Sequence, residues 1–281
     1  MSKKVCGITG TTIGIGSVVT ASLAKRKDTI VMLNRDSRAS EQLQRDLEVY
    51  AVSKDIHAIP CKLESWASVA EATDRVMAEF GRVDLLVNTA QSLYPSPRAT
   101  PGGIELTLRA NFLAHAQLSM RFLETIRANH GRVVNVVGGP FPAKNIVPQD
   151  SERASPTGHP ALNLNRSRLL VFTLELARRL GPDASAVAVN PGPINSDPTE
   201  GMPIFSRLSA RMRALPPHAA AIPLMKAATG EIGASGELLG IRGVEAIPEE
   251  LADPELGRRL WDWCESLLAA EAAAPPVVSA K

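Results

Sequence analysis

The sequence predicts a doubly wound α/β domain, in which a mostly parallel sheet is covered by helices on both faces. Two observations predict this fold. Short apolar runs alternate with longer amphipathic segments along most of the 281 residues. A glycine-rich turn also separates the first apolar run from the first amphipathic segment. Strands that alternate with helices form right-handed crossovers and one sheet with two covered faces.

Strands are expected where the runs are short, apolar and rich in β-branched residues, as buried parallel strands are. These runs are Val5–Ile8, Thr29–Asn34, His57–Cys61, Leu85–Thr89, Val133–Val137 and Ala186–Asn190. The amphipathic segments between them predict helices at Ile15–Arg26, Ala39–Val52, Ser68–Phe80, Ile104–Asn129 and Ala161–Leu180. The fourth and fifth strands are therefore expected to be joined through one long helix.

The region after Asn190 is rich in proline, which resists a long helix. We expect a short helical substrate lid over about 193–229, built from pieces at Ile204–Leu215 and His218–Thr229. A last edge strand is expected at Leu238–Ile241 and a terminal helix at Pro254–Ala273. Residues 1–274 are thus predicted to form a single domain, and residues 275–281 a loose tail.

Charge and cysteine content narrow the classes of partner. A net charge of +2 and a pI near 8.5 do not favour nucleic acid. Three scattered cysteines, without CxxC or Cys/His spacing, predict neither a disulfide framework nor a metal site, and they fit a cytoplasmic protein. No apolar run approaches the roughly 20 residues that a membrane span needs, so no membrane partner is expected.

The glycine turn, Thr9–Gly16, has the spacing of a dinucleotide-binding turn. Gly10 permits a tight turn without a Cβ, and Gly14 lets bare backbone approach a pyrophosphate. Gly16 allows the helix to pack closely on the strand. The helix that starts near Ile15 would present its positive end to the phosphates.

The second predicted strand ends in Asn34, followed by Arg35 and Asp36. An acidic residue at the strand tip favours the free ribose hydroxyl of NAD, whereas a guanidinium suits a 2′-phosphate. Asn34 and Arg35 therefore predict NADP(H) as the cofactor. Because Asp36 is acidic and follows Arg35 directly, NADH remains an alternative cofactor.

Further segments match one protein family in order along the chain. They are Thr9–Gly16, Asn34-Arg35-Asp36, Leu85–Ala90, Arg109–Phe112, Arg132–Val136, Phe172–Leu180, Asn190–Ser196 and Asp253–Trp261. Together they resemble the short-chain dehydrogenase/reductase family over nearly the whole chain, and within it the retinol dehydrogenase and WW-domain oxidoreductase branch. The resemblance implies a Rossmann-type sheet and a homo-oligomer, either a dimer or a tetramer.

The resemblance also implies a set of cofactor-binding residues. They are Gly10, Thr12, Ile13, Gly14, Ile15, Asn34, Arg35, Leu63, Asn88, Ala90, Arg166, Pro191, Gly192 and Ile194. Three positions near this set depart from the family pattern, because Lys62 replaces an aspartate, Thr89 an asparagine and Gln91 a glycine. The side chain of Gln91 could crowd the ribose or reach into the active site.

The chemistry of the family uses a serine, a tyrosine, a lysine four residues after the tyrosine, and a helix asparagine. The matching segments place Gly138 at the serine, Leu162 at the tyrosine and Arg166 at the lysine. Only Asn111 is kept. Leucine has no exchangeable proton and glycine has no hydroxyl, so the usual carbonyl–alcohol mechanism is unavailable at these positions.

Hydride transfer itself needs only proximity, orientation and an electron-poor carbon. The sequence therefore favours an NADPH-dependent reductase of a small-molecule substrate with an iminium group or a conjugated C=C bond. Asn111, Arg166 and His159 are the candidate catalytic residues, and further polar candidates are His115, Asn163, Asn165 and Tyr94. A nucleotide-binding protein without turnover and a non-redox isomerase or cyclase are the alternatives.

Overall fold

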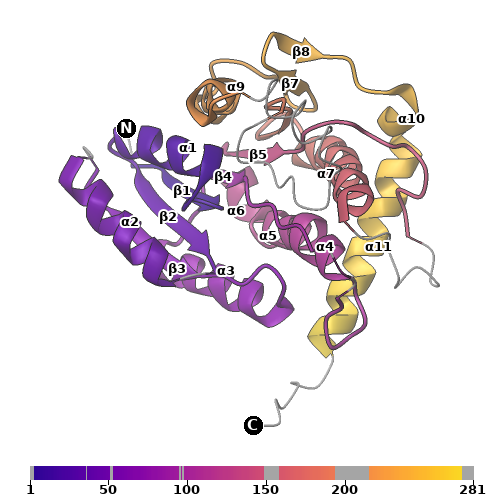
Figure 1. The fold of residues 1–281 in the computed structure, drawn as a ribbon, viewed down its shortest axis with the longest axis horizontal. Coiled ribbons are helices and arrows are strands. Elements are labelled where there is room, and N and C mark those ends of the chain that lie inside the picture. The colour runs from indigo at the N-terminus through magenta and orange to yellow at the C-terminus, as the bar shows by residue number, and fades with distance from the viewer. Residues whose placement is uncertain are drawn as a thin grey trace.

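The computed structural model describes residues 3–35, 37–50, 53–94, 96, 98–148, 158–193 and 215–273. Within them, eight strands form one sheet in the order β3-β2-β1-β4-β5-β6-β7-β8 (Figure 1). The strands are β1 (Val5–Thr9), β2 (Thr29–Asn34), β3 (Ile56–Pro60), β4 (Leu85–Asn88), β5 (Arg132–Val136), β6 (Ser185–Val189), β7 (Leu238–Gly240) and β8 (Gly243–Glu245).

The sheet confirms the predicted doubly wound fold. Neighbouring strands run parallel except β7 and β8, which are antiparallel. The strand order changes direction between β1 and β4, and open α/β sheets bind ligands at such a point, outside the carboxyl ends of the strands. The first seven strands lie within one residue of the predicted bounds at either end, whereas β8 was not predicted.

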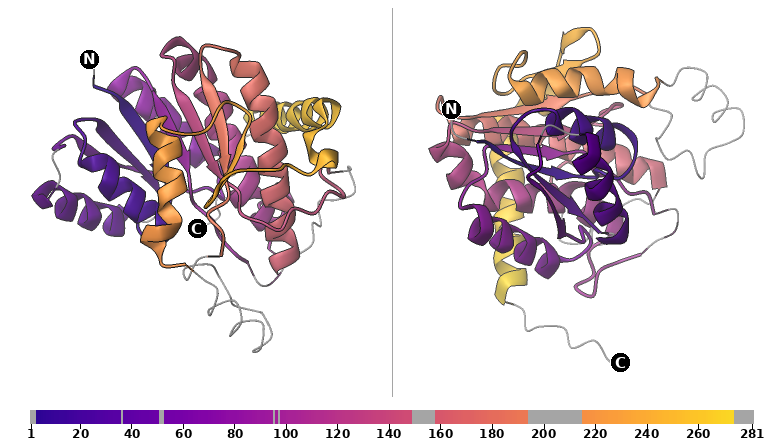
Figure 2. Two further views of the ribbon diagram at one scale, coloured as in Figure 1. Left: turned by 90° about the horizontal axis from the view of Figure 1, so that it is seen from above. Right: turned by 90° about the vertical axis from the view of Figure 1, so that its left-hand side faces the viewer.

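Helices cover both faces of the sheet, and each face has its own apolar core. The helices are α1 (Gly14–Ala24), α2 (Ser37–Tyr50), α3 (Trp66–Phe80), α4 (Leu106–Leu108), η1 (Arg109–Leu113), α5 (Ala114–Arg121), α6 (Leu123–Ala128), α7 (Gly158–Leu180), α9 (Pro217–Thr229), α10 (Glu249–Ala252) and α11 (Pro254–Ala273). One core joins α1, α2 and α9 to the sheet, and the other joins α3, α5, α7 and α11. Figure 2 shows these layers on either side of the strands.

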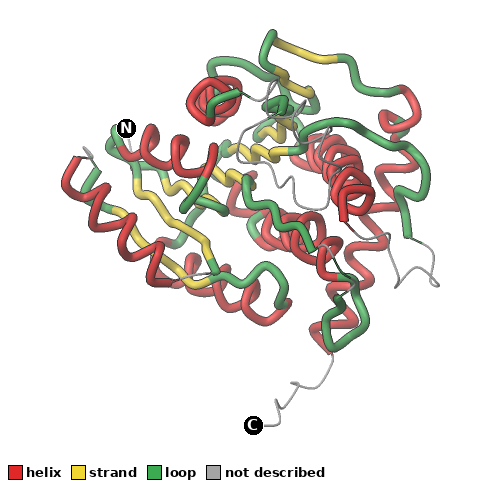
Figure 3. Tube along the Cα trace, in the orientation of Figure 1, coloured by secondary structure: helices red, strands yellow, loops and turns green. Residues whose placement is uncertain are grey.

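The prediction of one continuous helix over Ile104–Asn129 is wrong. The helix begins later because the Glu105 carboxylate caps it and accepts a hydrogen bond from the Leu108 N–H at 2.8 Å. One turn of π-helix, η1, follows, and a second interruption at Phe122 separates α5 from α6. Most of the segment between β4 and α4 is loop (Figure 3).

The predicted lid lies only partly within the described residues. Residues 194–214, including nearly all of the expected helix at Ile204–Leu215, lie outside them. The second expected piece is α9, which begins with Pro217 and packs against α1 and β5 as part of the layer that covers the sheet. The lid therefore stays a prediction for residues 194–214 alone.

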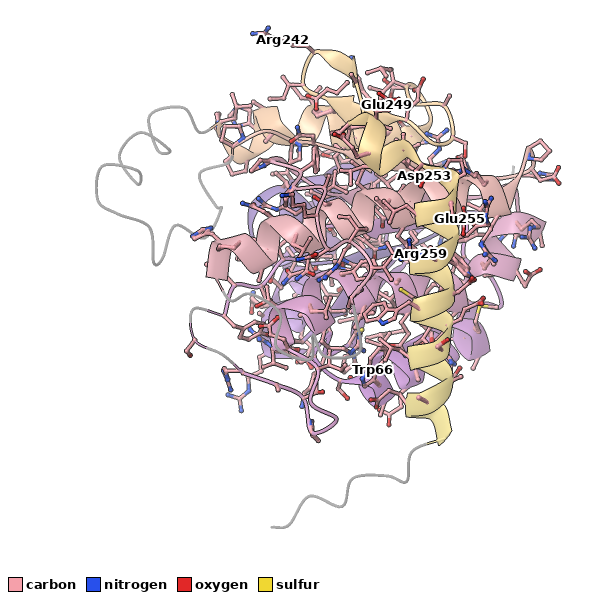
Figure 4. The ribbon with its side chains drawn as sticks, turned by 90° about the vertical axis from the view of Figure 1, so that its right-hand side faces the viewer. Trp66, Arg242, Glu249, Asp253, Glu255 and Arg259 are labelled. Atoms are coloured by element: carbon pink, nitrogen blue, oxygen red, sulfur yellow. The ribbon has the colours of Figure 1, made fainter. Side chains whose placement is uncertain are left out.

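The terminal helix α11 has the predicted bounds and packs against α7. Its first turn is capped by Asp253, whose carboxylate accepts hydrogen bonds from the N–H groups of Glu255 at 2.9 Å and Leu256 at 3.3 Å. Figure 4 shows Asp253 and Glu255 where this helix begins. Stacking between Phe172 and Trp261, with ring centroids 5.0 Å apart, fixes α11 on α7.

The three cysteines are buried and free. Burial raises the pKa of the Cys6 and Cys61 thiols to about 12, and it also raises the pKa of Cys264. Among the described residues there is no group of three or more His, Cys, Asp or Glu side chains that could hold a metal ion. None of the helices in the described part of the chain is both long and apolar enough to cross a bilayer.

Candidate functional site

The glycine turn lies at the carboxyl ends of β1 and β4, where the backbone is packed too closely for side chains. Gly10 has a φ of 69°, and a Cβ on it would lie 2.7 Å from the Ala90 Cα. A Cβ on Gly16 would lie 2.0 Å from the Gly10 carbonyl oxygen. Both positions therefore need glycine, because the turn folds against the loop after β4.

The first N–H groups of α1 have no side-chain cap. Residue Ile13 stands at the N-cap position, makes no side-chain hydrogen bond there, and is 75% exposed. By contrast, Ser65 caps α3, Glu105 caps α4 and Asp253 caps α11. The uncapped N–H groups of α1, next to bare glycine backbone, can bind an anion with the positive end of the helix dipole.

The buried side chain of Asn34 holds the glycine turn through hydrogen bonds. Its Oδ1 accepts a hydrogen bond from the Thr11 N–H at 3.1 Å, and its Nδ2 donates to Thr11 Oγ1 at 2.6 Å and Ser40 Oγ at 3.0 Å. The side chain is buried. Asn34 therefore ties the end of β2 to the glycine turn and to α2.

Arg35 follows β2 and extends toward the segment after β3. Its Nη1 donates to Glu64 Oε1 at 2.9 Å, and the arginine side chain is 66% exposed. The Tyr94 hydroxyl donates to the same oxygen at 2.6 Å. Burial and this hydrogen bond raise the pKa of Tyr94, so its hydroxyl stays protonated and donates to Glu64.

Other predicted cofactor residues lie along the same edge of the sheet. Ala90 packs against Gly10, and Leu63 packs on the core beside α3. The Asn88 Nδ2 donates to Asn135 Oδ1 at 2.8 Å, so that side chain links β4 to β5 within the sheet. Pro191 is buried after β6, and Gly192 has a φ of 70° beneath the Ile241 side chain. Ile194 lies outside the described residues.

Gly138 follows β5 with a φ of 64°, a backbone conformation that L side chains rarely adopt. A Cβ on Gly138 would lie 3.4 Å from both Cζ and Nε of Arg166. The Arg166 guanidinium therefore lies next to the place where a side chain of residue 138 would begin. Leu162, one turn earlier on α7, is buried.

Gln91 and Arg166 contact each other, although both depart from the pattern expected at their positions. The Arg166 Nη2 donates to Gln91 Oε1 at 2.7 Å, and its Nη1 lies 3.5 Å from Asn163 Oδ1. The amide of Gln91 thus holds the guanidinium beside Gly138. This pair was not predicted from the sequence, because 75 residues separate its members. Gln91 and Arg166 both differ from the family pattern, and this coincidence was the sequence signal that could have suggested their contact.

A cavity of about 640 Å³ opens beside the start of α7. It is lined mainly by apolar residues of the segment after β5 and of the first turns of α7. His159 and Asn163 also line it, and the contact between Asn163 and Arg166 connects it to the guanidinium. The structure thus brings His159 to the same helix face as Asn163 and Arg166.

Asn111 lies in the π-helical turn η1 and anchors the loop after β4. Its Oδ1 accepts from the Ser92 N–H at 2.7 Å, and its Nδ2 donates to the carbonyl oxygens of Ser92 and Thr107 at 2.7 and 2.8 Å. The Nδ1 of His115 lies 3.2 Å from the Asn111 carbonyl oxygen. Burial lowers the pKa of His115 to about 4, so this histidine is neutral and packed inside the protein.

The model of the family described as short chain dehydrogenase matches residues 4–139, which include the glycine turn, Asn111 and Gly138. Human retinol dehydrogenase 13 is 27% identical over 284 residues, which cover 94% of this chain and 84% of that protein. This chain is similar to the short-chain dehydrogenase family over nearly half of its length. The predicted resemblance to the family and to its retinol dehydrogenase branch is confirmed.

Solved structures share the fold of this chain. A putative uncharacterized protein from Mycobacterium paratuberculosis superposes with a TM-score of 0.71 at 22% identity, over 95% of this chain and 94% of the other. L-sorbose reductase from Gluconobacter frateurii, solved with NADPH and L-sorbose, has a TM-score of 0.66 at 18% identity and covers 85% of this chain and 95% of its own. These likenesses support the predicted Rossmann-type architecture.

Proposed function

We propose that this chain is an atypical NADP(H)-dependent reductase of a small molecule with an iminium group or a conjugated C=C bond. The observation that carries this proposal is the cavity of about 640 Å³ that is lined by His159 and Asn163, because the Asn163 Oδ1 also lies 3.5 Å from Arg166 Nη1. Such a volume suits a small organic substrate, and a few polar groups on an apolar wall would orient it.

The residues at the carboxyl ends of the strands fit a dinucleotide. The uncapped start of α1 and the backbone of Gly10 and Gly14 would bind the pyrophosphate, and Arg35 would bind a 2′-phosphate. The nicotinamide end would lie toward Gly192 and Arg166. The cofactor supplies the hydride. The NADPH in the structure of L-sorbose reductase supports the choice of cofactor.

The residues around the cavity suit a substrate that needs no phenol. An iminium carbon already carries positive charge, so hydride transfer to it requires no proton donor at Leu162. In a conjugated carbonyl compound, the Arg166 guanidinium would stabilise the negative charge that develops on the carbonyl oxygen. His159, which lines the cavity, would protonate the carbon next to that carbonyl group.

A nucleotide-binding protein without turnover is the second candidate. The contact between Gln91 and Arg166 favours it, because that contact engages the guanidinium beside Gly138 with the protein's own amide. In this case the nucleotide would stabilise the fold, and the cavity would have no catalytic role.

The test combines binding with turnover. Calorimetry should detect NADPH binding, and the absorbance of NADPH should fall when cyclic iminium compounds or enones are added. Arg166→Ala should reduce turnover of enones more than turnover of iminium compounds, because only the enones develop an oxyanion. Binding of NADPH without consumption across both substrate classes would favour the second candidate.

A further inference from the structure

One carboxylate oxygen joins the ends of two neighbouring strands and the loop after β4. Glu64 Oε1 accepts hydrogen bonds from Arg35 Nη1 at 2.9 Å and from the Tyr94 hydroxyl at 2.6 Å. Arg35 follows β2 and Glu64 follows β3, and these strands are paired with Asn34 opposite Pro60. The Arg35 guanidinium, which would bind a ribose 2′-phosphate, is therefore already paired with the Glu64 carboxylate.

Glu64 keeps its negative charge in this arrangement. Burial alone would raise its pKa, but the hydrogen bond from Tyr94 and the charge of Arg35 outweigh burial and lower the pKa of Glu64. Its side chain is 23% exposed, whereas that of Arg35 is 66% exposed. The carboxylate is thus fixed by its surroundings, and the guanidinium is the more exposed member of the pair.

We propose that Glu64 determines how strongly the chain discriminates NADP(H) from NAD(H). This inference rests on the proposed nucleotide site. A 2′-phosphate that approaches Arg35 must share the guanidinium with Glu64, and the two anions repel each other. The 2′-hydroxyl of NAD(H) carries no charge and can donate a hydrogen bond to the carboxylate. Glu64 therefore weakens the binding of NADP(H) and leaves that of NAD(H) unchanged or stronger.

Removal of the charge at Glu64 tests this inference. Glu64→Gln keeps an oxygen for the Tyr94 hydroxyl, and Glu64→Ala removes the side chain. In both variants of the full chain, calorimetry should show NADP⁺ binding about fivefold tighter, the size of a partly exposed ion pair. The dissociation constant for NAD⁺ should stay the same or rise. The ratio of the two constants would not change if Glu64 only stabilised the fold.

Glu71→Gln is the matched control, because it removes an equal charge from an exposed position on α3. This variant should keep the wild-type ratio of dissociation constants. If both nucleotides bind and the Glu64 variants keep that ratio as well, the inference about Glu64 is wrong while the nucleotide site stands. If neither nucleotide binds any form of the folded chain, the inference and the proposed function are both overturned.

Discussion

At the scale of single residues, the surroundings of Gly138 differ from the family pattern in more than the loss of functional groups. The chain has a left-handed backbone at Gly138 and a guanidinium against it. Gln91 accepts a hydrogen bond from that guanidinium. Because the Arg166 guanidinium lies against Gly138 and contacts the Gln91 amide, substituting Gly138 alone by serine does not recreate the family's serine site.

Gly138→Ser should therefore destabilise the protein without restoring carbonyl reduction. The serine would stand at a φ of 64° and its Cβ would lie 3.4 Å from Arg166. A left-handed L residue costs roughly 1–2 kcal/mol, which urea unfolding can measure. Gly139→Ser is the control, because a Cβ at that position comes no closer than 3.9 Å to its neighbours. An unchanged unfolding midpoint for Gly138→Ser would contradict the strained conformation.

Arg35→Ala should weaken NADP⁺ binding about tenfold, because a charge-assisted hydrogen bond to the 2′-phosphate is lost. Binding of NAD⁺ should change little. Isothermal calorimetry with both nucleotides measures the difference. Arg45→Ala removes an exposed arginine from α2 and should alter neither constant. Equal losses for NADP⁺ and NAD⁺ in Arg35→Ala would remove the case for a 2′-phosphate at this arginine.

At the scale of elements, the start of α1 provides a test of the phosphate site. Gly14→Asp places a carboxylate at the first helical residue, where a pyrophosphate would meet the N–H groups, and should abolish binding of NADP⁺. Calorimetry measures this loss.

The same substitution also strains the backbone, since Gly14 has a φ of 63°. Gly81→Asp reproduces that strain at a φ of 69° after α3, with no atom within 4 Å of its Cβ. This control should be less stable than wild type yet still bind NADP⁺. Retained binding in Gly14→Asp would show that the phosphate site is wrongly assigned.

The buried His115 of α5 gives an expectation for the pH dependence of stability. The pKa of His115 falls to about 4 in the folded chain because the side chain is buried, whereas an unfolded histidine has a pKa of about 6.5. The unfolded chain therefore binds the extra proton, and His115 destabilises the fold as the pH falls from about 6.5 to 4. From pH 7.5 to 5 this loss should be about 2 kcal/mol.

Urea unfolding of wild type and His115→Gln at both pH values measures this contribution. The variant lacks the titrating ring, so its stability should fall less over that interval. The difference between the two pH dependences isolates His115 from the other ionisable groups. Parallel curves for the two proteins would contradict the lowered pKa.

The elements show how far the sequence predicts the structure. The buried strands were predicted because each is a short apolar run, and α11 because Pro254 opens a periodic segment. The helix over 104–129 was predicted without its interruptions, since apolar periodicity does not register a π-turn at Arg109–Leu113. The hairpin strand β8 was not predicted, because Val244 is its one apolar side chain and no apolar run marks it.

At the scale of the whole molecule, the site depends on contacts that local sequence does not specify. The glycine turn was predictable because strand, turn and helix are adjacent in the chain. The contacts of Arg35 with Glu64 and of Gln91 with Arg166 span 29 and 75 residues, so they follow from the order of strands in the sheet. The sequence could indicate that these positions are unusual, but only the fold shows which ones meet.

The three buried thiols allow unfolding of the intact protein to be measured by alkylation, without an added label. Cys6 lies in β1, Cys61 just after β3 and Cys264 in α11, so they sample both cores. A thiolate is the species that alkylating reagents attack, and the raised pKa values suppress it while the chain is folded. Iodoacetamide should therefore label these sites only through unfolding, and mass spectrometry of each cysteine would compare the opening of the two faces.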